Sequence, residues 1–209
     1  MKSANRARAR RNAPQSQLPR AVLLFGGLGL IVVVMVIVVF VLGINSSNIT
    51  PLVSTKDPGN FSEETLPELP RNHIARGQPH EPYNSNPPTS GPHNGDKMVP
   101  VEEGFYDELN KQVDEDVLHS MEHGYVIIWY DCTKAPNQDC DPLKEAIRQL
   151  MRSSNGGYHL IANPRDGQME TMIALTSWTK LRRLETFDAD VIKDFIARNL
   201  NQSPEPGGP

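Results

Sequence analysis

Hydrophobic residues follow two different patterns along the chain. Near the N-terminus, residues 21–43 form one uncharged run rich in Val, Ile and Leu. As a helix this run would span about 34 Å, against a hydrocarbon core of roughly 30 Å. Backbone polar groups in lipid must be satisfied within the segment, so the run predicts a transmembrane helix. A cleaved signal peptide is the alternative, but its apolar core is typically shorter, about 7 to 15 residues.

Beyond residue 70, apolar positions recur at the spacings of helices and strands. Helical spacing over 105–121 predicts a helix, with Asp114 as the point where a break would fall. The β-branched and aromatic run 125–130 predicts a buried strand. Asp141 and the following Pro142 predict the start of a helix that extends to residue 151. Further strands are expected at 158–162, 171–176 and 180–185, and a last helix runs from Asp188 or Asp190 to residue 199.

This order of elements predicts an α+β domain, a small mixed sheet with helices packed on it. A strand-helix-strand unit implies a right-handed crossover between parallel strands, which places the helix on one face of the sheet. The closing order of strand, helix, two strands and helix is thioredoxin-like in outline. No C-x-x-C motif accompanies it, so this likeness concerns shape alone.

The composition divides the chain into five parts. A basic tail (1–20) and the transmembrane helix (21–43) precede a polar stalk (44–70), whose apolar residues are too sparse to bury a core. The globular domain is expected at 71–201, and it opens with a proline-rich segment over 71–100 that has no repeating period. Residues 202–209 form a polar Pro/Gly tail that we expect to be frayed.

Charge sets the orientation of the chain in the membrane. Residues 1–20 hold six Lys or Arg side chains and no acid, and cytoplasmic flanks are the basic ones. The N-terminus is therefore expected inside the cytoplasmic membrane and the domain outside the cytoplasm. All 25 acidic residues follow this tail. The exported part is thus acidic, which argues against nucleic acid as a partner, because phosphate neutralisation needs a basic surface.

The chain has two cysteines, Cys132 and Cys140, and an oxidising compartment would let them form a disulfide. A redox-active dithiol is the functional alternative. The spacing is not C-x-x-C, and Lys134 is the one cationic neighbour that would lower the pKa of a thiol. We therefore expect a structural bond.

Five of the six histidines fall between His73 and His123. His119 and His123 stand at positions i and i+4, where a helix directs both imidazoles toward one metal ion. Neutral imidazole suits Zn, Cu, Ni and Fe(II), and Glu122, Asp116 or Met121 would complete or support the ligand shell.

Two alternatives remain for the same histidines. The segment His119-Ser-Met-Glu122-His123 matches H-x-x-E-H, a zinc peptidase pattern in which the glutamate is the general base. A zinc-dependent hydrolase of that kind needs a further acidic ligand and a larger scaffold. Alternatively, the two imidazoles interact with the C-terminal dipole of the helix and have a structural role.

Several motifs resemble one known family. These are YNSNPPTSGPH over 83–93, HSMEHG over 119–124, the earlier Asn-His-Ile at 72–74 and the later IALTSW over 173–178. Together they resemble an uncharacterised bacterial and archaeal family of membrane-anchored exported domains of unknown function, over roughly residues 71–200. In that family Ala-Leu usually stands where this chain has Ser120-Met121. The resemblance supplies no activity, but it implies a shared fold and a shared site built from His80, His93, His119, Glu122 and His123.

The residues favour a metal-binding domain without enzymatic activity. Pro and Gly residues would make the loop before His93 rigid, and a rigid loop that directs one histidine at a helix with two more suits a three-nitrogen site. We expect Cu or Zn to be bound by His93, His119 and His123, with His80 or Glu122 as a fourth ligand. A protein-interaction module of the cell envelope is the alternative class, and in that case the proline-rich string would be a structural plug docked across the sheet.

Overall fold

The computed structural model of the chain describes residues 62–96, 99 and 104–207. The predicted basic tail, the transmembrane helix over 21–43 and most of the predicted stalk lie outside these residues. Within the described part of the chain, no helix is both long enough and apolar enough to span a membrane. The fold described below is therefore that of the globular domain.

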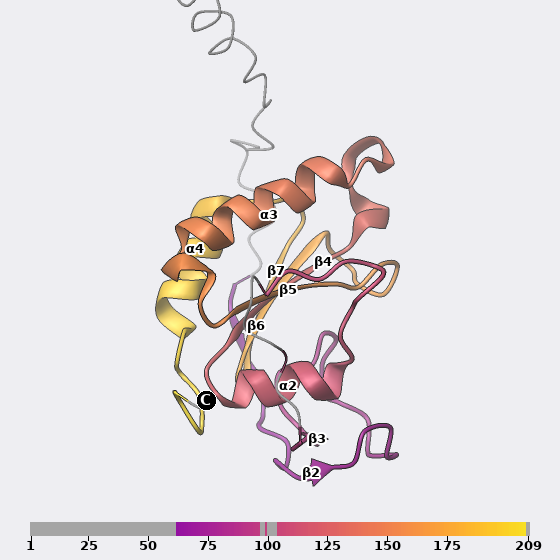
Figure 1. Cartoon of the computed structure of the whole chain (residues 1–209), viewed down its shortest axis with the longest axis vertical. Coiled ribbons are helices and arrows are strands. Elements are labelled where there is room, and N and C mark those ends of the chain that lie inside the picture. The colour runs from indigo at the N-terminus through magenta and orange to yellow at the C-terminus, as the bar shows by residue number, and fades with distance from the viewer. Residues whose placement is uncertain (1–61, 97–98, 100–103, 208–209) are drawn as a thin grey trace, which may run out of the picture. The chain divides into compact units, whose positions relative to one another are not determined.

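One mixed sheet forms the centre of the domain (Figure 1). Its strands lie in the order β1-β7-β6-β4-β5, where β4 and β5 are parallel and the other neighbours are antiparallel. The parallel pair is joined by a helix, as the strand-helix-strand pattern predicted. The strands are β1 (Glu64–Thr65), β4 (Val126–Tyr130), β5 (Leu160–Pro164), β6 (Ile173–Ser177) and β7 (Lys180–Leu184).

Helices cover both faces of the sheet (Figure 1). Helices α3 (Asp141–Ser153) and α4 (Ala189–Asn199) lie on one face, and α2 (Asp114–Glu122) lies on the other. Side chains alternate along each strand, so Ile128 packs toward α3 and α4 whereas Ile127 and Trp129 pack toward α2. The α+β class is confirmed.

Most of the expected elements are confirmed within two or three residues at their ends. The four strands expected from 125 onward are β4, β5, β6 and β7, and the two later helices are α3 and α4. Asp188 caps α4, because its carboxylate accepts hydrogen bonds from the backbone N–H groups of Asp190 and Val191. Helix α3 begins at Asp141, one residue earlier than expected.

The helix predicted over 105–121 is wrong in its first half. Helix α2 begins only at Asp114, and the preceding segment runs beside β5 instead. Phe105 bridges Ala162, and the N–H of Tyr106 donates to the carbonyl of Ala162 at 2.9 Å. Leu109, which the helical pattern counted as an apolar position, is 96 % exposed. Pairing with the edge of the sheet satisfies backbone groups that a helix would otherwise have used.

The sheet also begins earlier than the expected boundary at residue 71. Strand β1 falls in the range assigned to the stalk, and it pairs with β7 so that Glu64 lies opposite Leu181. A second, two-stranded parallel sheet joins β2 (His73–Ile74) to β3 (His93–Asn94). Two-residue strands carry no periodicity, which is why the sequence pattern did not show them.

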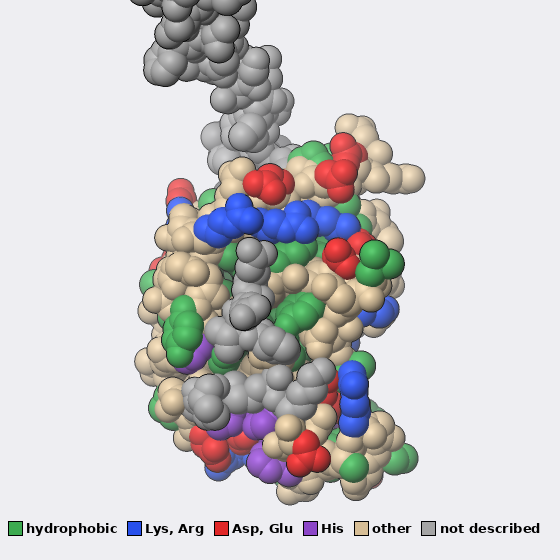
Figure 2. Space-filling model, viewed as in Figure 1, with side chains coloured by type: hydrophobic (Ala, Val, Ile, Leu, Met, Phe, Trp, Pro, Cys, Tyr) green, Lys and Arg blue, Asp and Glu red, His purple; other side chains and the backbone are tan. Residues whose placement is uncertain are grey.

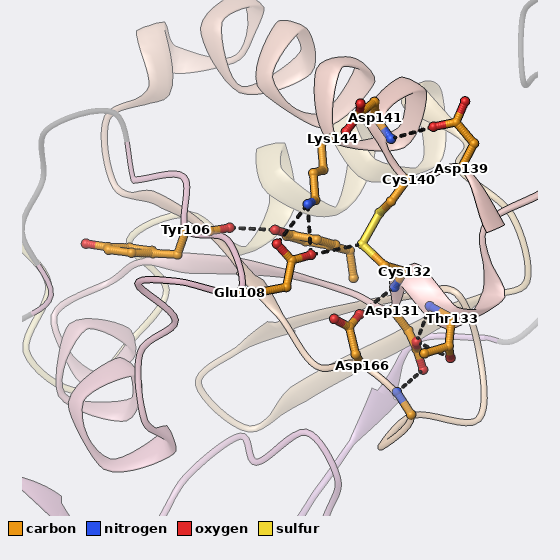
Figure 3. The surroundings of a disulfide bond; sticks show 12 residues. Tyr106, Glu108, Asp131, Cys132, Thr133, Asp139, Cys140, Asp141, Lys144 and Asp166 are labelled. Atoms are coloured by element: carbon orange, nitrogen blue, oxygen red, sulfur yellow. Dashed lines mark hydrogen bonds and ion pairs between the residues drawn. A yellow bond between two sulfur atoms is a disulfide. The ribbon is translucent and has the colours of Figure 1, made fainter.

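The two cysteines form a disulfide between the end of β4 and the start of α3 (Figure 3). Their Cα atoms are 5.2 Å apart, so the expected pairing of Cys132 with Cys140 is confirmed. The backbone N–H of Cys132 donates to Asp166 at 2.6 Å, and Lys144 on α3 forms an ion pair with Glu108 beside the sulfur. The bond closes the irregular connection that leads from β4 into α3.

Candidate functional site

The last turn of helix α2 contributes two buried side chains to the candidate site. His119 and Glu122 are three residues apart and so project from the same face of the helix. Their exposed fractions are 7 % and 2 %. His123 ends the helix, with its ring centroid 5.0 Å from that of His119. One helical turn therefore offers two imidazoles and a carboxylate.

The parallel pair of β2 and β3 brings two more imidazoles to the same place. Its register sets His73 opposite His93, with ring centroids 5.0 Å apart. The ring of His119 lies 5.5 Å from that of His93 and 5.6 Å from that of His73. Three histidines from three elements thus surround one point beside α2.

The proline-rich string over 83–93 holds His93 in position. The backbone N–H of Leu69 donates to the hydroxyl of Ser90 at 3.0 Å, and the N–H of Thr179 donates to the carbonyl of Thr89 at 2.9 Å. Residues 87–91 are buried. The string is therefore docked against the turn that joins β6 to β7, and it presents His93 from a fixed base.

Tyr83 closes this string on itself. Its hydroxyl donates to the carbonyl of Pro92 at 2.8 Å. Burial raises the pKa of the Tyr83 hydroxyl well above its ordinary value, and the charges of Glu115 and Asp114 raise it further. Gly91 has a φ of +131°, and a Cβ added there would lie 2.9 Å from the ring of Tyr83. Glycine is thus required for the close approach that precedes His93.

The buried pair of His93 and Glu122 is the central contact of the site. The Nδ1 atom of His93 lies 2.9 Å from the carbonyl oxygen of Gly91, and its Nε2 atom lies 3.0 Å from Oε2 of Glu122. A neutral imidazole has one N–H, so when Nδ1 donates to Gly91 the lone pair of Nε2 faces a carboxylate oxygen. This geometry requires a cation between the two atoms, either a proton or a metal ion.

Glu122 contacts nitrogen atoms from two segments, residues 71–73 and His93. Its Oε1 atom lies 3.3 Å from Nη1 of Arg71, and its Oε2 atom lies 3.7 Å from Nε2 of His73 as well as next to His93. A carboxylate buried this deeply is costly unless it is paired and hydrogen-bonded. The guanidinium of Arg71 and the ring nitrogens of the two histidines supply these contacts.

A group of side chains with metal-ligand spacing lies at this point. One ligand atom each from His73, His119 and Glu122 lie within 4.8 Å of one another, and His93 adjoins the group through Glu122. Imidazole nitrogen and carboxylate oxygen are donors for divalent first-row metals. We call these four residues the His/Glu cluster.

The structure brings together some of the residues expected from sequence and not others. His93, His119 and Glu122 meet in the cluster, and His123 lies one turn further along α2. His80 lies elsewhere, with its ring tilted against that of Tyr83 at a centroid distance of 4.7 Å and its Nε2 atom 3.6 Å from Glu115. Among the described residues, the groups able to hold a metal ion do not include His80.

His73 is the cluster member that was not selected as a ligand from the sequence. Its motif, Asn-His-Ile, was noted as part of the family resemblance, and this was the signal that could have identified it. Nothing local predicts that His73 pairs in register with His93, because that contact depends on two short strands from different parts of the proline-rich segment.

A second buried carboxylate supports the cluster from behind. Asp116, one turn before His119 on α2, accepts a hydrogen bond from the side-chain amide of Asn94 at 3.0 Å. Its other oxygen lies 3.2 Å from Nη2 of Arg76. Because Asn94 follows His93 directly, this contact ties β3 to α2 and fixes the distance between the cluster histidines.

The cluster is accessible from the surface at one side. The side chain of His73 is 59 % exposed, whereas His93 is fully buried. Histidine side chains (purple) gather beside acidic ones (red) near the lower end of the view in Figure 2. A groove of about 530 Å³ runs past the strands that carry His73 and His93, and it is lined by residues that include Asn72, Ile74, Pro79, Pro82 and Pro92. A molecule bound there would contact Ile74 of β2 and Pro92, which directly precedes β3.

A further group with metal-ligand spacing combines Glu108, Cys132 and Asp166 (Figure 3). The sulfur of Cys132 lies 3.5 Å from Glu108, but it is bonded to Cys140. A disulfide sulfur offers no thiolate, which is the form that binds metals. This group therefore belongs to the disulfide and is not a metal site.

Comparison with known proteins places the chain in one family. No curated protein and no solved structure matches it. Residues 73–209 match the family described as protein of unknown function (DUF3105), in a range that begins at His73 and contains the whole His/Glu cluster. Because this range covers more than half of the sequence, the chain belongs to the DUF3105 family of proteins of unknown function.

Proposed function

We propose that the domain binds one transition-metal ion through His73, His119 and Glu122, with His93 as a fourth ligand. The contact between His93 and Glu122 carries this proposal. Ligand atoms about 2.0–2.1 Å from a tetrahedral metal lie roughly 3.3 Å from each other. The 3.0 Å distance from Nε2 to Oε2, which is that of a hydrogen bond, is therefore also close to the spacing of two neighbouring ligands.

The hydrogen bonding of His93 supports the same conclusion. A metal-bound histidine almost always donates its other ring N–H to a carboxylate or a backbone carbonyl, which fixes the tautomer. His93 has this arrangement, since Nδ1 lies at the carbonyl of Gly91 and Nε2 faces the cluster. The donors are imidazoles and one carboxylate, without thiolate, and we propose zinc or copper(II) as the ion.

The position of Glu122 favours binding over hydrolysis. In an H-x-x-E-H peptidase the glutamate activates a water molecule and is not itself a ligand. Here the oxygens of Glu122 contact the guanidinium of Arg71 and the ring nitrogens of His73 and His93, and they are not directed at an open position. We propose a role in metal binding or delivery, without turnover.

We further propose that the domain faces the outside of the cytoplasmic membrane and is anchored by a helix over residues 21–43. The uncharged run, the basic tail before it and the disulfide support this placement. Protease added to intact spheroplasts tests it, with cleavage of the domain as the expected result. A domain that is degraded only after lysis would overturn this topology.

The outline of the domain is also consistent with a thioredoxin-like shape. Strand β4, helix α3 and strand β5 form a parallel unit, and β6, β7 and α4 complete it. The disulfide lies between β4 and α3 but encloses more residues than a C-x-x-C motif. We propose a likeness of shape alone, with no transfer of redox activity.

Metal content of the full-length protein, purified in detergent and supplied with zinc or copper, tests the metal site. We expect one ion per chain in the wild type and none in His73→Ala or His119→Ala. His73 is the better probe, because its exposed side chain can be removed with little effect on folding. His80→Ala is the matched control, and it should retain the ion.

A wild type that binds no ion, and whose melting temperature is unchanged by either metal, would refute the proposal. The envelope interaction module would then be the better hypothesis. Retention of metal in His73→Ala and His119→Ala together with its loss in His80→Ala would place the site elsewhere. In Glu122→Gln we expect weaker metal binding in a folded protein.

A further inference from the structure

The C-terminal segment lies against the end of helix α2. The N–H of Asn201 donates to the carbonyl of Gly124 at 2.9 Å, and the N–H of Glu205 donates to the carbonyl of Glu122 at 3.1 Å. Gly124 has a φ of +98°, and a Cβ there would lie 2.8 Å from Asn201. The segment expected to be a frayed tail thus places a carboxylate beside the His/Glu cluster.

This segment completes a second group with metal-ligand spacing. One ligand atom each from Glu122, His123 and Glu205 lie within 4.8 Å of one another. The Nδ1 atom of His123 lies 3.2 Å from the backbone carbonyl oxygen of Glu205. When Nδ1 carries the proton and donates to this carbonyl, the lone pair of Nε2 is available to bind a metal ion. Glu122 belongs to both groups, and a carboxylate with two oxygens can bridge two cations.

Arg71 lies between the two carboxylates of this second group. Its Nη1 atom is 3.3 Å from Oε1 of Glu122 and 3.6 Å from Oε1 of Glu205. The other oxygen of Glu122, Oε2, faces His73 and His93. The guanidinium therefore contacts the outer side of the shared carboxylate, where a second ion would be bound. A guanidinium remains charged at every accessible pH, so it repels a divalent ion at this distance.

We infer that Glu122, His123 and Glu205 form a second cation position, in which Arg71 stands in place of a metal ion. The inference rests on the proposed metal site. With Arg71 present the centre takes one ion, at His73, His119 and Glu122. Without it, a second divalent ion binds across the bridging carboxylate, and the centre becomes dinuclear. Arg71 thus sets the number of metal ions.

The number of ions per chain tests this directly, with zinc titrated into the full-length protein by calorimetry and counted by elemental analysis. We expect one ion in the wild type, two in Arg71→Gln and one in the double variant Arg71→Gln/Glu205→Gln. Arg198→Gln is the matched control, since Arg198 also bridges two carboxylates, Glu63 and Asp194. It should bind one ion, as the wild type does.

The results separate this inference from the proposed function. One ion in the wild type and one in Arg71→Gln overturns the inference alone, as does a wild type that already binds two. Two ions in the double variant also overturn it, because Glu205 would then not be a ligand. No ion in the wild type refutes the proposed function. In that case, one ion in Arg71→Gln and none in the double variant would still show that Glu205 contributes to a cation position that Arg71 blocks. Arg71→Met, which keeps the length of the side chain, replaces Arg71→Gln in the same count if that variant does not fold.

Discussion

The two faces of the central sheet are packed with different kinds of side chain. The face under α3 and α4 buries apolar residues, among them Ile128, Leu175 and Phe195. The face under α2 also has apolar residues, and beside them Asp116, His119 and Glu122 of α2 contact the strand pair of β2 and β3. This polar cluster is open to solvent at His73, whereas the core under α3 and α4 is apolar and buried.

This contrast separates stability from function within one domain. Burial of apolar surface stabilises at about 25 cal/mol per Å², whereas a buried charge costs free energy unless it is paired. Replacement of buried ion pairs by apolar residues is often neutral or stabilising. A domain selected for stability alone would have no need of imidazoles and carboxylates under α2. The difference supports the proposed metal site at the end of α2.

The largest expected effect is on the apolar face. Phe195→Ala removes a fully buried ring from α4 and should lower the free energy of unfolding by about 3–5 kcal/mol. Chemical denaturation measures this loss, and Leu109→Ala, at a position 96 % exposed, is the control that should stay within about 0.5 kcal/mol. The folded variant should still bind one metal ion. Loss of the ion would show that the two faces are not independent.

An intermediate effect is expected from Gly95→Ala on the polar face. The added Cβ would lie 2.5 Å from Cγ of His73 and 2.6 Å from its Nδ1 atom, so the imidazole must move. Rotation of the exposed ring does not relieve a third contact, 2.9 Å from Cβ of His73, so β2 must shift as well and stability should fall by about 1–3 kcal/mol. Metal affinity should fall on the order of 10-fold, as measured by calorimetry. In the His73→Ala background, where Cγ and Nδ1 are absent, Gly95→Ala should cost less stability than in the wild type, and an undiminished loss would mean that Gly95 acts through another residue.

The smallest effect is a dependence on alkaline pH. Burial holds the pKa of Tyr83 above the value of about 10 found in an unfolded chain. Above that pH the unfolded chain releases a proton that the folded domain retains. The contribution of Tyr83 to the free energy of unfolding is therefore fully present below about pH 10 and is lost as the pH rises. Tyr83→Phe should lose about 1 kcal/mol with its hydrogen bond to Pro92, and should then fall less steeply above pH 10.

Denaturation curves at a series of pH values measure the slope of the free energy of unfolding against pH. Burial also raises the pKa of Tyr106, to about 12, and this residue is unchanged in the variant, so part of the slope should remain. Equal slopes for the two proteins would contradict the assigned role of Tyr83. A steeper slope in the variant would contradict it as well.

The sequence pattern predicted the elements whose periodicity is local. Strand β4 is a continuous apolar run, and α4 begins at a capping aspartate and has an apolar stripe, so both were located from neighbouring residues. The segment over 105–113 has helical spacing as well, but its start bridges β5 at Ala162 and the backbone of Gln112 hydrogen-bonds to the side chain of Asn163 on β5. Tertiary pairing overrode the local pattern there, because it satisfies backbone groups beside a buried strand.

The candidate site divides in the same way. Helix geometry predicted that His119 and His123 share one face, and their ring centroids lie 5.0 Å apart, whereas Glu122 was expected as a residue that completes or supports the ligand shell. The family resemblance and the rigid string before His93 predicted that this residue joins the same site. His73 and Glu205 reach the same point through a strand pair and a C-terminal segment, which no local spacing shows.

The sequence alone predicted the class of the domain and the pairing of the two cysteines. It also led to the expectation of a membrane anchor and of a histidine site on α2. Each of these depends on composition or on residues close together in the chain. Only the tertiary structure decided which histidines meet, that Glu122 is shared between two groups, and that Arg71 contacts it from the outer side. These contacts join segments far apart in the sequence, and their geometry depends on strand register and packing rather than on any repeating pattern.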